Sequence, residues 1–452
     1  MTQTADVVIC GAGITGIAAA HFLGRAGVRN ILLVDERPPL SFTSDHSTEC
    51  YRNWWPDPAM QALMDRSIDL METLADESGN IFHMNRRGYL YVTADESKVP
   101  ELEAASRRIS ELGAGPLRIH SAESSSYQPS TPEGFHDSPP GADLLLGSEL
   151  IRAYFPYLTG KAIAALHARR AGWLSAQQLG MYLLETGRRL GVRFESARVT
   201  GVDMANGRVN GVALNSGERI ASPIFVNAAG PYLKAVGNLL GADLPVHTEL
   251  HLKAAIKDPL GVVGRDAPLL IWNDAQTLPW EKDEREALSE DGETRWLTEV
   301  FPAGAHTRPE GAGDDILMLW EYQTKVMEPI DPPPMDEQYP EIALRGLAAM
   351  LPRMKEYFVR MPHPQLDGGY YTRTRENRPL VGPVDALRVD GAYVIGAVSG
   401  YGIMSACGVA DLLAAHVMGG TLPAYASDLS PARYDDLNYR KKLETWGDSG
   451  QL

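Results

Sequence analysis

The sequence predicts an α/β protein built around a Rossmann-like, nucleotide-binding domain. Two observations carry this prediction. A glycine-rich turn joins an apolar strand to a helix within the first 25 residues, and a second such junction lies near residue 400. The chain of 452 residues, with 44% hydrophobic and 22% charged residues, has a globular composition and room for about two large domains.

The charge and the cysteine content exclude several classes of protein. Lys plus Arg number 42 and Asp plus Glu 58, so the net charge is −16, which argues against nucleic acid or an anionic membrane surface as a partner. No stretch approaches the roughly 20 apolar residues of a membrane-spanning helix. The N-terminus shows no targeting pattern, so we expect a cytoplasmic protein. Three scattered cysteines predict neither a disulfide framework nor a metal site.

The first element is the apolar run Val7–Cys10, which is typical of a buried parallel strand. The glycine turn 11–16 follows, then the helical pattern 17–23 and a second strand at 30–34. That strand ends on Asp35-Glu36, an acid nineteen residues beyond the last glycine of the turn. This context turns a weak G-x-G-x-x-G signal into a strong prediction of dinucleotide binding.

Each glycine of the turn has a separate expected task. Gly11 permits the tight turn, Gly13 lets the backbone approach a pyrophosphate, and Gly16 lets helix and strand pack closely. The pyrophosphate then lies at the N-terminus of the helix. Asp35, or failing that Glu36, accepts hydrogen bonds from the adenosine ribose, which disfavours the 2′-phosphate of NADP.

The later elements favour a flavin over a nicotinamide. Residues 192–202 and 209–214 alternate like the two strands of a hairpin, and 224–226 leads into Asn227-Ala228-Ala229-Gly230. Strand 392–396 then meets Ser399-Gly400-Tyr401-Gly402, which opens the helix 403–417. A helix N-terminus facing the pyrimidine ring would stabilise the anionic reduced flavin, whereas a nicotinamide dehydrogenase has no evident use for this second junction.

At four places, in order, the chain resembles the D-amino acid oxidase and sarcosine oxidase group of FAD-dependent amine oxidoreductases. They are the fingerprint 11–16 with 32–35, the polar loop 43–48, the segment 226–230, and the tail from 371–374 through 399–402. The resemblance implies one FAD per chain. It also implies a discontinuous, doubly wound FAD-binding domain and an α+β substrate domain on an antiparallel sheet.

The implied FAD-binding domain comprises residues 1–85, 165–245 and 366–430, the substrate domain 86–164 and 246–365, and a C-terminal tail 431–452. Local patterns agree, since 87–92 and 316–320 look like strands and 175–190 like a helix. Residues 125–141, rich in Ser and Pro, predict a surface loop. Residues 281–295 carry seven acids and three bases and predict a solvated insertion helix, with a lid or an oligomer contact as the alternative.

In such enzymes the flavin carries the chemistry, and the protein supplies orientation and electrostatics. The family resemblance places His46 in the loop beside the flavin, where relatives have a histidine that is either covalently bound to FAD or unattached. Non-covalent FAD is the expectation, with covalent attachment through His46 as the alternative. Cys50 lies four residues on. Gly369 replaces the cysteine through which other relatives attach FAD, so that linkage is excluded.

The resemblance also assigns the substrate side. Tyr371 matches a tyrosine that lines the substrate cavity, and Met404 replaces a lysine that binds the substrate carboxylate in sarcosine oxidases. A thioether cannot pair with a carboxylate, so Arg52, Arg373 or Arg375 must do so if one is bound. Tyr51, Trp54 and Trp55 form either a cage for a cationic amine or ordinary core.

Oxygen reactivity in the family often depends on a lysine near the flavin. Its equivalent here falls near Met318, and Lys253 is a candidate substitute. The candidate catalytic residues are therefore Tyr371, His46 and Lys253, and the candidate substrate residues are Arg52, Tyr371 and Arg373. The predicted FAD site consists of Gly11, Gly13, Ile14, Thr15, Gly16, Asp35, Glu36, Ser44, His46, Ser47, Thr48, Val199, Ala229, Gly230, Gly400, Tyr401, Gly402, Ile403 and Met404.

The sequence thus predicts an FAD-dependent amine oxidase or dehydrogenase. It would oxidise the C–N bond of a secondary or N-methylated amine, or of an amino-acid-like compound larger than sarcosine. The imine product hydrolyses, and the electrons pass to oxygen or to another acceptor. One alternative is oxidation of a C–OH bond with His46 or His251 as proton acceptor, and another is a non-catalytic flavoprotein assembly factor. Whether the chain is a monomer or a homodimer stays open.

Overall fold

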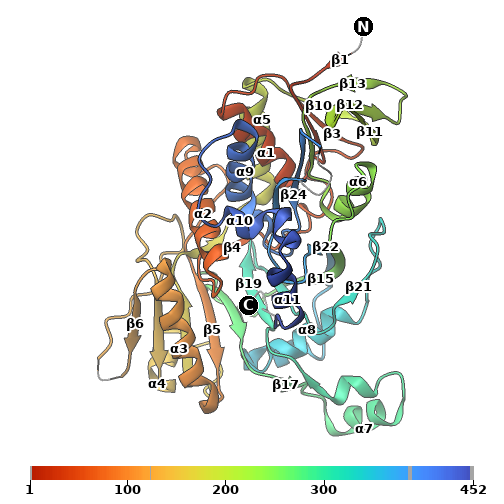
Figure 1. Cartoon of the computed structure of the whole chain (residues 1–452). Helices are drawn as coiled ribbons and strands as arrows, with labels where there is room; N and C mark the ends of the chain where they lie inside the picture. Colours follow the sequence, from red (N-terminus) through yellow and green to blue (C-terminus); the bar gives the residue numbers. More distant parts are fainter. Residues whose placement is uncertain (1–2, 123, 385–388, 448–452) are drawn as a thin grey trace.

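The computed structural model describes residues 3–122, 124–384 and 389–447. Its upper part in Figure 1 is a six-stranded sheet in the order β10-β3-β2-β14-β24-β23. All neighbours in this sheet are parallel except β23 and β24. The strands are β2 (Val7–Cys10), β3 (Ile31–Asp35), β10 (Val192–Ser196), β14 (Phe225–Asn227), β23 (Leu380–Pro383) and β24 (Ala392–Gly396).

Both faces of this sheet are buried, which explains its continuous apolar runs. Because successive side chains point to opposite faces, Val7 and Ile9 pack on the helical side, while Val8 packs against a second sheet. The helical side holds α1 (Ile14–Arg25), α2 (Pro58–Ser78), α5 (Ala176–Arg189) and α9 (Gly402–Met418). The second sheet, in the order β1-β13-β12-β11, contains β1 (Gln3–Thr4), β11 (Val199–Ala205), β12 (Arg208–Leu214) and β13 (Arg219–Ala221).

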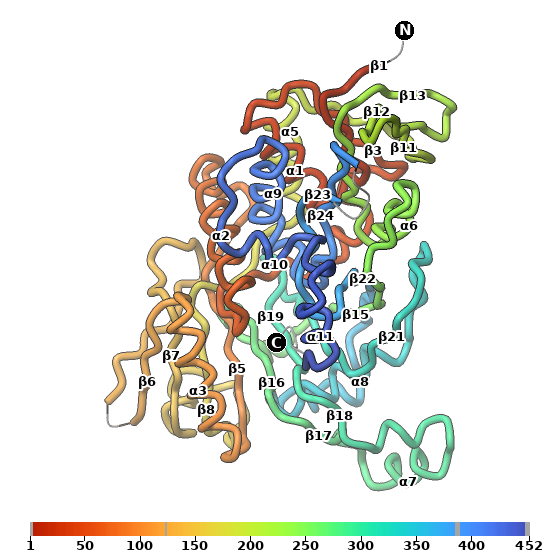
Figure 2. Tube along the Cα trace, in the orientation of Figure 1, coloured from red at the N-terminus to blue at the C-terminus, as the bar shows by residue number. Residues whose placement is uncertain are grey.

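Segments from opposite ends of the chain meet in this layer. Figure 2 shows α1, near the N-terminus, beside α9, near the C-terminus, and α9 also packs on α2. The predicted first strand, glycine turn and helix are confirmed, and so is the late helix that follows the second glycine turn.

The prediction of one strand over residues 192–202 is wrong. Residues 192–196 form β10, which joins the parallel sheet beside β3, whereas 199–205 form β11, which makes the hairpin with β12. The chain leaves one sheet for the other at Ala197, whose amide donates to the Asp35 carbonyl oxygen. Periodicity could not reveal this break, because both strands alternate in the same way.

The lower part of the molecule is a ten-stranded sheet in the order β21-β15-β20-β19-β16-β5-β8-β7-β6, with β22 also paired to β15. It is not fully antiparallel as predicted, because β16 pairs with β5, and β6 with β7, in parallel. Its strands are β5 (Tyr89–Thr93), β6 (Leu117–His120), β7 (Ala142–Leu146), β8 (Ala164–Ala168), β15 (His247–Lys257), β16 (Leu269–Trp272), β19 (His306–Glu310), β20 (Asp315–Leu319), β21 (Lys325–Val326) and β22 (Gln365–Arg373).

The predicted division into domains stays a prediction. Two strands that it assigns largely to the FAD-binding part, β8 and β22, are hydrogen-bonded into the ten-stranded sheet. Short strands complete the fold: β4 (Cys50–Arg52) with β9 (Ala171–Trp173), and β17 (Gln276–Thr277) with β18 (Val300–Phe301). The remaining helices are α3 (Val99–Ile109), α4 (Ser148–Tyr154), α6 (Leu233–Leu239), α7 (Lys282–Glu290), α8 (Tyr339–Leu347), α10 (Ala426–Leu429) and α11 (Leu437–Glu444).

Within the acidic segment 281–295, residues Lys282–Glu290 form α7, which lies at the end of the molecule farthest from the six-stranded sheet (Figure 1). None of its residues is buried, so the prediction of a solvated helix is confirmed. Described residues between 125 and 141 form the predicted loop. None of the helices in the described ranges is long and apolar enough to cross a membrane.

Candidate active site

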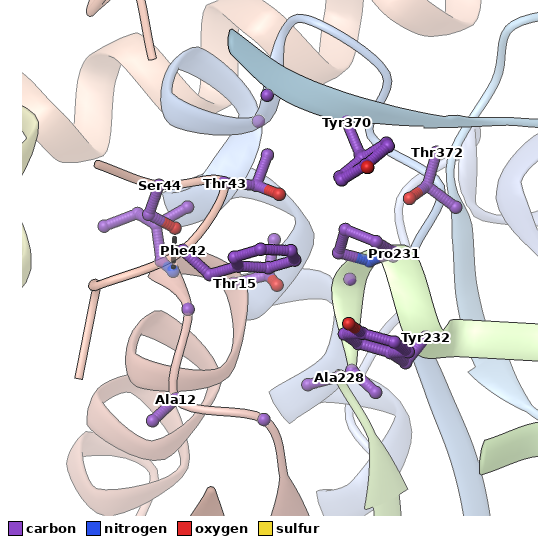
Figure 3. Close-up of a pocket in the computed structure, with 18 of the residues that line it drawn as sticks. Ala12, Thr15, Phe42, Thr43, Ser44, Ala228, Pro231, Tyr232, Tyr370 and Thr372 are labelled. Atoms are coloured by element: carbon purple, nitrogen blue, oxygen red, sulfur yellow. Dashed lines mark hydrogen bonds between the residues drawn. The ribbon is translucent and has the colours of Figure 1, made fainter. Parts of the chain in front are cut away.

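A cavity of about 430 Å³ lies between the two large sheets. The carboxyl ends of β2, β3, β14 and β24 line one side, and β15, β20 and β22 line the other. Figure 3 shows part of this lining, with Ser44 and Thr43 on the side of α1, and Pro231, Tyr232 and Tyr370 on the opposite side. Ligands of open α/β sheets bind at this edge of the strands.

The glycine turn has the geometry that the fingerprint predicts. Gly11 has φ +116°, a region that favours glycine, and a Cβ atom there would lie 2.3 Å from the Ala228 carbonyl oxygen. A Cβ on Gly16 would lie 1.9 Å from the Gly11 carbonyl oxygen. Gly13, the N-cap of α1, offers no side chain at the helix end. The N-terminus of α1 is therefore open to an anion.

The loops around this helix end hold it in place. The Asp35 carboxylate accepts hydrogen bonds from the Ala12 and Arg37 amides, at 2.8 and 2.9 Å. The Ser44 hydroxyl accepts one from the Ile14 amide at 3.0 Å. The lining includes these residues of the predicted FAD site: Gly11, Gly13, Ile14, Thr15, Asp35, Glu36, Ser44, His46, Ser47, Thr48, Val199, Ala229, Gly230, Gly400, Gly402 and Ile403.

Three predicted FAD residues lie elsewhere. Gly16 packs against Gly11 behind the lining. Tyr401 and Met404 line a smaller, neighbouring cavity, and the Tyr401 hydroxyl donates to the Asn377 carbonyl oxygen.

The residues present fit an FAD. Thr43 lines the cavity, and its Oγ1 atom is buried without a hydrogen-bond partner among the described residues. A dinucleotide can supply such a partner, since its phosphates and ribityl hydroxyls are rich in polar atoms. The open helix end of α1 and the acid at the end of β3 fit the pyrophosphate and the ribose.

The side chains of His46 and Lys253 both contact Asp367, which the sequence analysis did not identify as a site residue. His46 Nδ1 lies 2.6 Å from Asp367 Oδ1, and Lys253 Nζ lies 3.2 Å from Asp367 Oδ2. Lys253 also donates to the Ser47 carbonyl oxygen at 2.9 Å. The hydrogen bond with Asp367 raises the pKa of His46. Burial opposes the charge of Asp367, but His46 and Lys253 outweigh it and lower its pKa to about 2.

The smaller cavity, here called the inner cavity, has a volume of about 60 Å³. It shares six lining residues with the main cavity: Thr48, His251, Leu252, Leu319, Tyr371 and Gly400. Its remaining lining is largely aromatic and includes Trp55, Tyr89, Trp320 and Tyr401. A substrate in the inner cavity would therefore lie directly against the contents of the main one.

Arg52 is a buried cation in the lining of the inner cavity. Its side chain is 4% exposed, and its guanidinium lies 4.6 Å from the centre of the Trp55 ring. Nη1 donates to the Tyr91 hydroxyl at 3.0 Å, and Nε has no partner. No carboxylate of the described residues forms an ion pair with it. A buried, unpaired charge is costly, so this site favours an anionic ligand.

His251 is a second ionisable residue in the lining of the inner cavity. The ring lies between two carboxylates, with Nδ1 3.3 Å from Glu321 and Nε2 3.3 Å from Glu249. It also stacks on Tyr371 at 3.7 Å between ring centres. Burial lowers the pKa of His251, but both carboxylates raise it, and their effect is the larger.

Several predicted substrate residues do not line either cavity. Arg373 donates to Glu249 at 2.9 Å, and the exposed Arg375 donates to the Leu443 carbonyl oxygen. Tyr51 and Trp54 are buried in the core, so only Trp55 remains of the predicted cage. Arg52 and Tyr371 both line the inner cavity, and their roles toward a substrate stay a prediction.

The sequence analysis missed Asp367, Glu249 and Glu321. Glu321 comes shortly after the apolar strand β20, much as Asp35 ends the apolar strand β3. The sequence therefore carried a local signal for Glu321. Glu249 alternates with two histidines along β15, which places all three on one face of the strand. The approach of Asp367 to His46 depends on the pairing of β22 with β15, which no local pattern shows.

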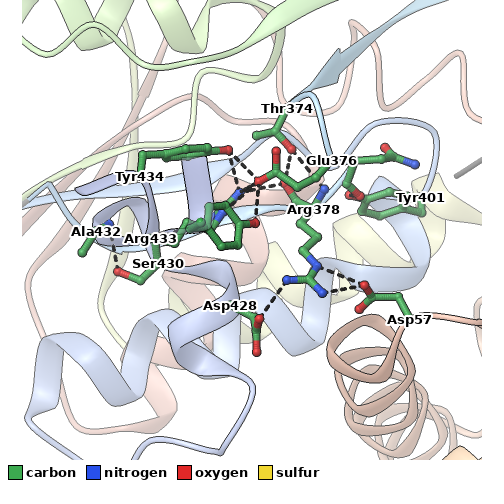
Figure 4. A network of polar contacts seen from close by, with 12 residues as sticks. Asp57, Thr374, Glu376, Arg378, Tyr401, Asp428, Ser430, Ala432, Arg433 and Tyr434 are labelled. Atoms are coloured by element: carbon green, nitrogen blue, oxygen red, sulfur yellow. Dashed lines mark hydrogen bonds and ion pairs between the residues drawn. The ribbon is translucent and has the colours of Figure 1, made fainter. Parts of the chain in front are cut away.

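The C-terminal segment is anchored beside the inner cavity by a buried polar network (Figure 4). Arg433 pairs with Glu376 at 2.8 Å, and the two side chains are 2% and 0% exposed. Arg378 pairs with both Asp57 and Asp428. Since Tyr401 donates to Asn377 of the same loop, the network supports one wall of the inner cavity.

Comparison with known proteins agrees with this geometry. The family described as DAO, FAD dependent oxidoreductase, matches residues 6–416. Mitochondrial dimethylglycine dehydrogenase of Rattus norvegicus is 24% identical over 444 residues, covering 95% of this chain and 45% of that protein. The chain thus spans about half the length of the curated relatives it matches.

Two solved structures illustrate the shared fold. L-proline dehydrogenase from P. horikoshii has a TM-score of 0.74 at 19% identity, and covers 96% of this chain and 99% of that one. Glycine oxidase from Geobacillus kaustophilus has a TM-score of 0.71 at 16% identity, with 95% and 98% covered.

Proposed function

This chain belongs to the DAO family of FAD dependent oxidoreductases, and from that premise we propose that it oxidises the C–N bond of an amine that also carries a carboxylate. The substrate class is a secondary or N-methylated amino acid. Dimethylglycine and proline, which appear in the names of two relatives, are both carboxylates with an alkylated nitrogen. A bound FAD would supply the hydride acceptor for the carbon next to that nitrogen.

Arg52 is the observation that carries the proposal. It is the buried cation of the inner cavity for which the described residues supply no ion-pair partner, and a guanidinium can bind a carboxylate through two parallel hydrogen bonds. In this role Arg52 would take the place of the carboxylate-binding lysine that Met404 replaces. The substrate carboxylate would lie at Arg52 and its reacting carbon toward the main cavity, which Tyr371 also lines.

The size of the inner cavity bears on the substrate. A volume of about 60 Å³ holds only a few non-hydrogen atoms, so any part of a substrate larger than sarcosine must extend into the main cavity. The imine product leaves and hydrolyses in water. Electrons then pass to oxygen or to another acceptor, with Lys253 as the candidate cation for the oxygen reaction.

The other proposed features concern the state of the protein. FAD would be held without a covalent bond; since Asp367 contacts Nδ1 of His46, the alternative of attachment would use the Nε2 atom. Acid precipitation then leaves the yellow colour in the supernatant, whereas colour in the pellet would indicate attachment through His46. A cytoplasmic location, and a monomer or homodimer that binds neither nucleic acid nor a membrane, complete the proposal.

The test is anaerobic mixing of the holoprotein with sarcosine, N,N-dimethylglycine, L-proline, glycine and lactate. We expect an N-alkylated amino acid to bleach the flavin absorbance fastest. Arg52→Met should raise the apparent Kd for that compound by about 100-fold while FAD stays bound, since hydrogen bonds to charged groups contribute about 1.5–3 kcal/mol each. Lys98→Met, at a partly exposed ion pair with Asp274, is the control.

Two results would contradict the proposal. Faster bleaching by lactate than by every amine would favour oxidation of a C–OH bond. Equal bleaching by N-methylbutylamine, which lacks a carboxylate, would remove the role of Arg52.

A further inference from the structure

The inner cavity has a negative group as well as a positive one. Glu321 lines it, two residues beyond the end of β20, and its side chain is 35% exposed. His306, buried in the same lining, is influenced by both charges, since Glu321 raises its pKa and Arg52 lowers it. Burial has the largest effect and lowers the pKa of His306, so this ring is neutral. A neutral imidazole therefore lies within reach of both charges.

Only one oxygen of the Glu321 carboxylate forms an ion pair among the described residues. Oε1 lies 3.3 Å from His251 Nδ1, and Oε2 makes no hydrogen bond within the described part of the chain. Burial raises the pKa of Glu321, but His251, His306 and Arg373 together lower it below its usual range. Glu321 is therefore an anion with a free oxygen in the lining of the cavity.

A row of alternating charges lies behind Glu321. Arg373 on β22 donates to Glu249, Glu249 contacts His251 on the same strand β15, and His251 Nδ1 lies 3.3 Å from Glu321. Because side chains two apart on a strand share one face, Glu249 and His251 lie side by side. Both carboxylates raise the pKa of His251 against the effect of burial, and its ring contacts Glu321 from behind.

The aromatic lining suits a cation in front of Glu321. The rings of Tyr371, Trp55, Tyr89 and Tyr401 all line the inner cavity. Tyr371 is close enough to Glu321 for that carboxylate to help raise the pKa of its hydroxyl, after burial, which has the largest effect. Faces of aromatic rings attract cations, and an adjacent carboxylate adds to that attraction.

We propose that Glu321 binds the cationic nitrogen of the substrate and makes the site selective for amino acids over uncharged carboxylates of the same shape. This inference rests on the proposed function, in which Arg52 binds the carboxylate. The two groups then match the two charges of a zwitterion.

The same anion would also act during oxidation. Only a deprotonated amine has the lone pair that oxidation needs, so the bound ammonium must first give its proton to water. As the C–H bond then breaks, its electron pair would leave as hydride to a bound FAD, and the nitrogen lone pair would form the second bond of the C=N group. The nitrogen thereby becomes positively charged. A fixed negative charge beside it stabilises that transition state.

The test is binding of two unreactive carboxylates of equal shape to the FAD-loaded protein. Glycine betaine carries a permanent charge on nitrogen, whereas 3,3-dimethylbutanoate has a neutral carbon in its place. Their Kd values are measured from the change in the flavin spectrum and by calorimetry. We expect betaine to bind wild-type protein roughly tenfold more tightly or better, as for other contacts with a charged group.

Glu321→Gln should remove this preference and leave the affinity for 3,3-dimethylbutanoate within about threefold. Asp315→Asn is the matched control, because it removes one charge at an equally exposed position on β20, where Asp315 pairs with Lys257, and should leave the preference unchanged. The wild-type comparison needs no variant, so the test holds even if Glu321→Gln does not fold.

Equal affinities in wild-type protein, or an unchanged preference in Glu321→Gln, would overturn the inference and leave the proposed function in place. Failure of both carboxylates to bind would remove the Arg52 anchor and the inference with it. If betaine is preferred but no amine bleaches the flavin, the proposed reaction alone fails.

Discussion

A Cβ atom at Gly16 would lie 1.9 Å from a backbone oxygen that cannot move without opening the glycine turn. We therefore expect Gly16→Ala to lower the free energy of unfolding by about 1–3 kcal/mol, as overpacking does elsewhere. FAD affinity should fall as well, because the turn and the helix end shift together. Urea unfolding and FAD titration measure the two effects.

Gly292→Ala is the control, because among the described residues nothing beyond its two chain neighbours lies within 4 Å of a Cβ built there. Its unfolding free energy should stay within about 0.5 kcal/mol of wild type. A Gly16→Ala protein with unchanged stability and FAD affinity would mean that the close packing of the turn is not required.

A variant of Lys253 can distinguish an oxidase from a dehydrogenase. Its charge lies in the lining of the main cavity, but it is shared with Asp367. We expect Lys253→Met to slow reoxidation of the reduced protein by oxygen by roughly tenfold, since a fixed cation stabilises developing superoxide. Stopped-flow mixing with oxygen and with a redox dye makes the measurement.

Reoxidation by the dye should be unchanged in Lys253→Met. Lys257→Met, four residues on along β15 and well exposed, is the control for the oxygen rate. Equal loss of both rates would show that Lys253 positions the site and has no specific role with oxygen.

The His46–Asp367 pair predicts a pH dependence of stability. The pKa of Asp367 is lowered from 3.8 to about 2, so its contribution is present above pH 3.8 and is lost as the pH falls toward 2. The pKa of His46 is raised from 6.5, so its contribution is present below pH 6.5 and is lost as the pH rises through the folded value. The pair therefore stabilises the protein most between about pH 4 and 6.5.

Asp367→Asn should reduce the unfolding free energy by on the order of 1 kcal/mol within that window, since both groups are partly exposed. The difference from wild type should shrink above the folded pKa of His46. Urea unfolding at a series of pH values tests this, and a difference that does not vary with pH would contradict the assignment.

At the scale of elements, the C-terminal helices depend on one buried ion pair. Arg433 and Glu376 are both almost fully buried, and Glu376 also accepts from Tyr434 and Tyr439 (Figure 4). Arg433→Met leaves a buried carboxylate without its cation, which costs about 3–5 kcal/mol. Thermal or urea unfolding of the variant measures the loss.

Arg107→Met breaks an ion pair on α3 in which the arginine is 57% exposed, and it should change stability by less than about 1 kcal/mol. A similar cost for both variants would show that the C-terminal network contributes no more than a surface pair.

The elements differ in how far the sequence predicts them. The turn 11–16 and the helix α9 were predictable, because their glycines and apolar periods act within a few residues. The break between β10 and β11 was not, since the two strands alternate alike. Glu321 carried a local signal at the end of an apolar strand, whereas Asp367 joins the site only through the pairing of β22 with β15, which depends on the whole sheet.

At the scale of the whole molecule, the main cavity is shared by both large sheets. FAD bound there at 100 times its Kd should raise the free energy of unfolding by about 2.7 kcal/mol. Removal of FAD should therefore speed amide hydrogen exchange both in α1 and in β15 and β22. Exchange measured with and without FAD tests this, and protection limited to α1 would show that the lower sheet does not sense the cofactor.

The pairing of α1 with α9 also bears on how the protein is made. During synthesis at about 5–20 residues per second, the glycine turn emerges roughly 20–80 seconds before the helix that completes its core. Until then the apolar face of α1 lacks the partner that covers it in Figure 2. The cofactor site can therefore form only after α9, Gly402–Met418, has left the ribosome, so loading with FAD waits for this helix, and a nascent chain stalled before residue 402 exposes a surface for chaperones.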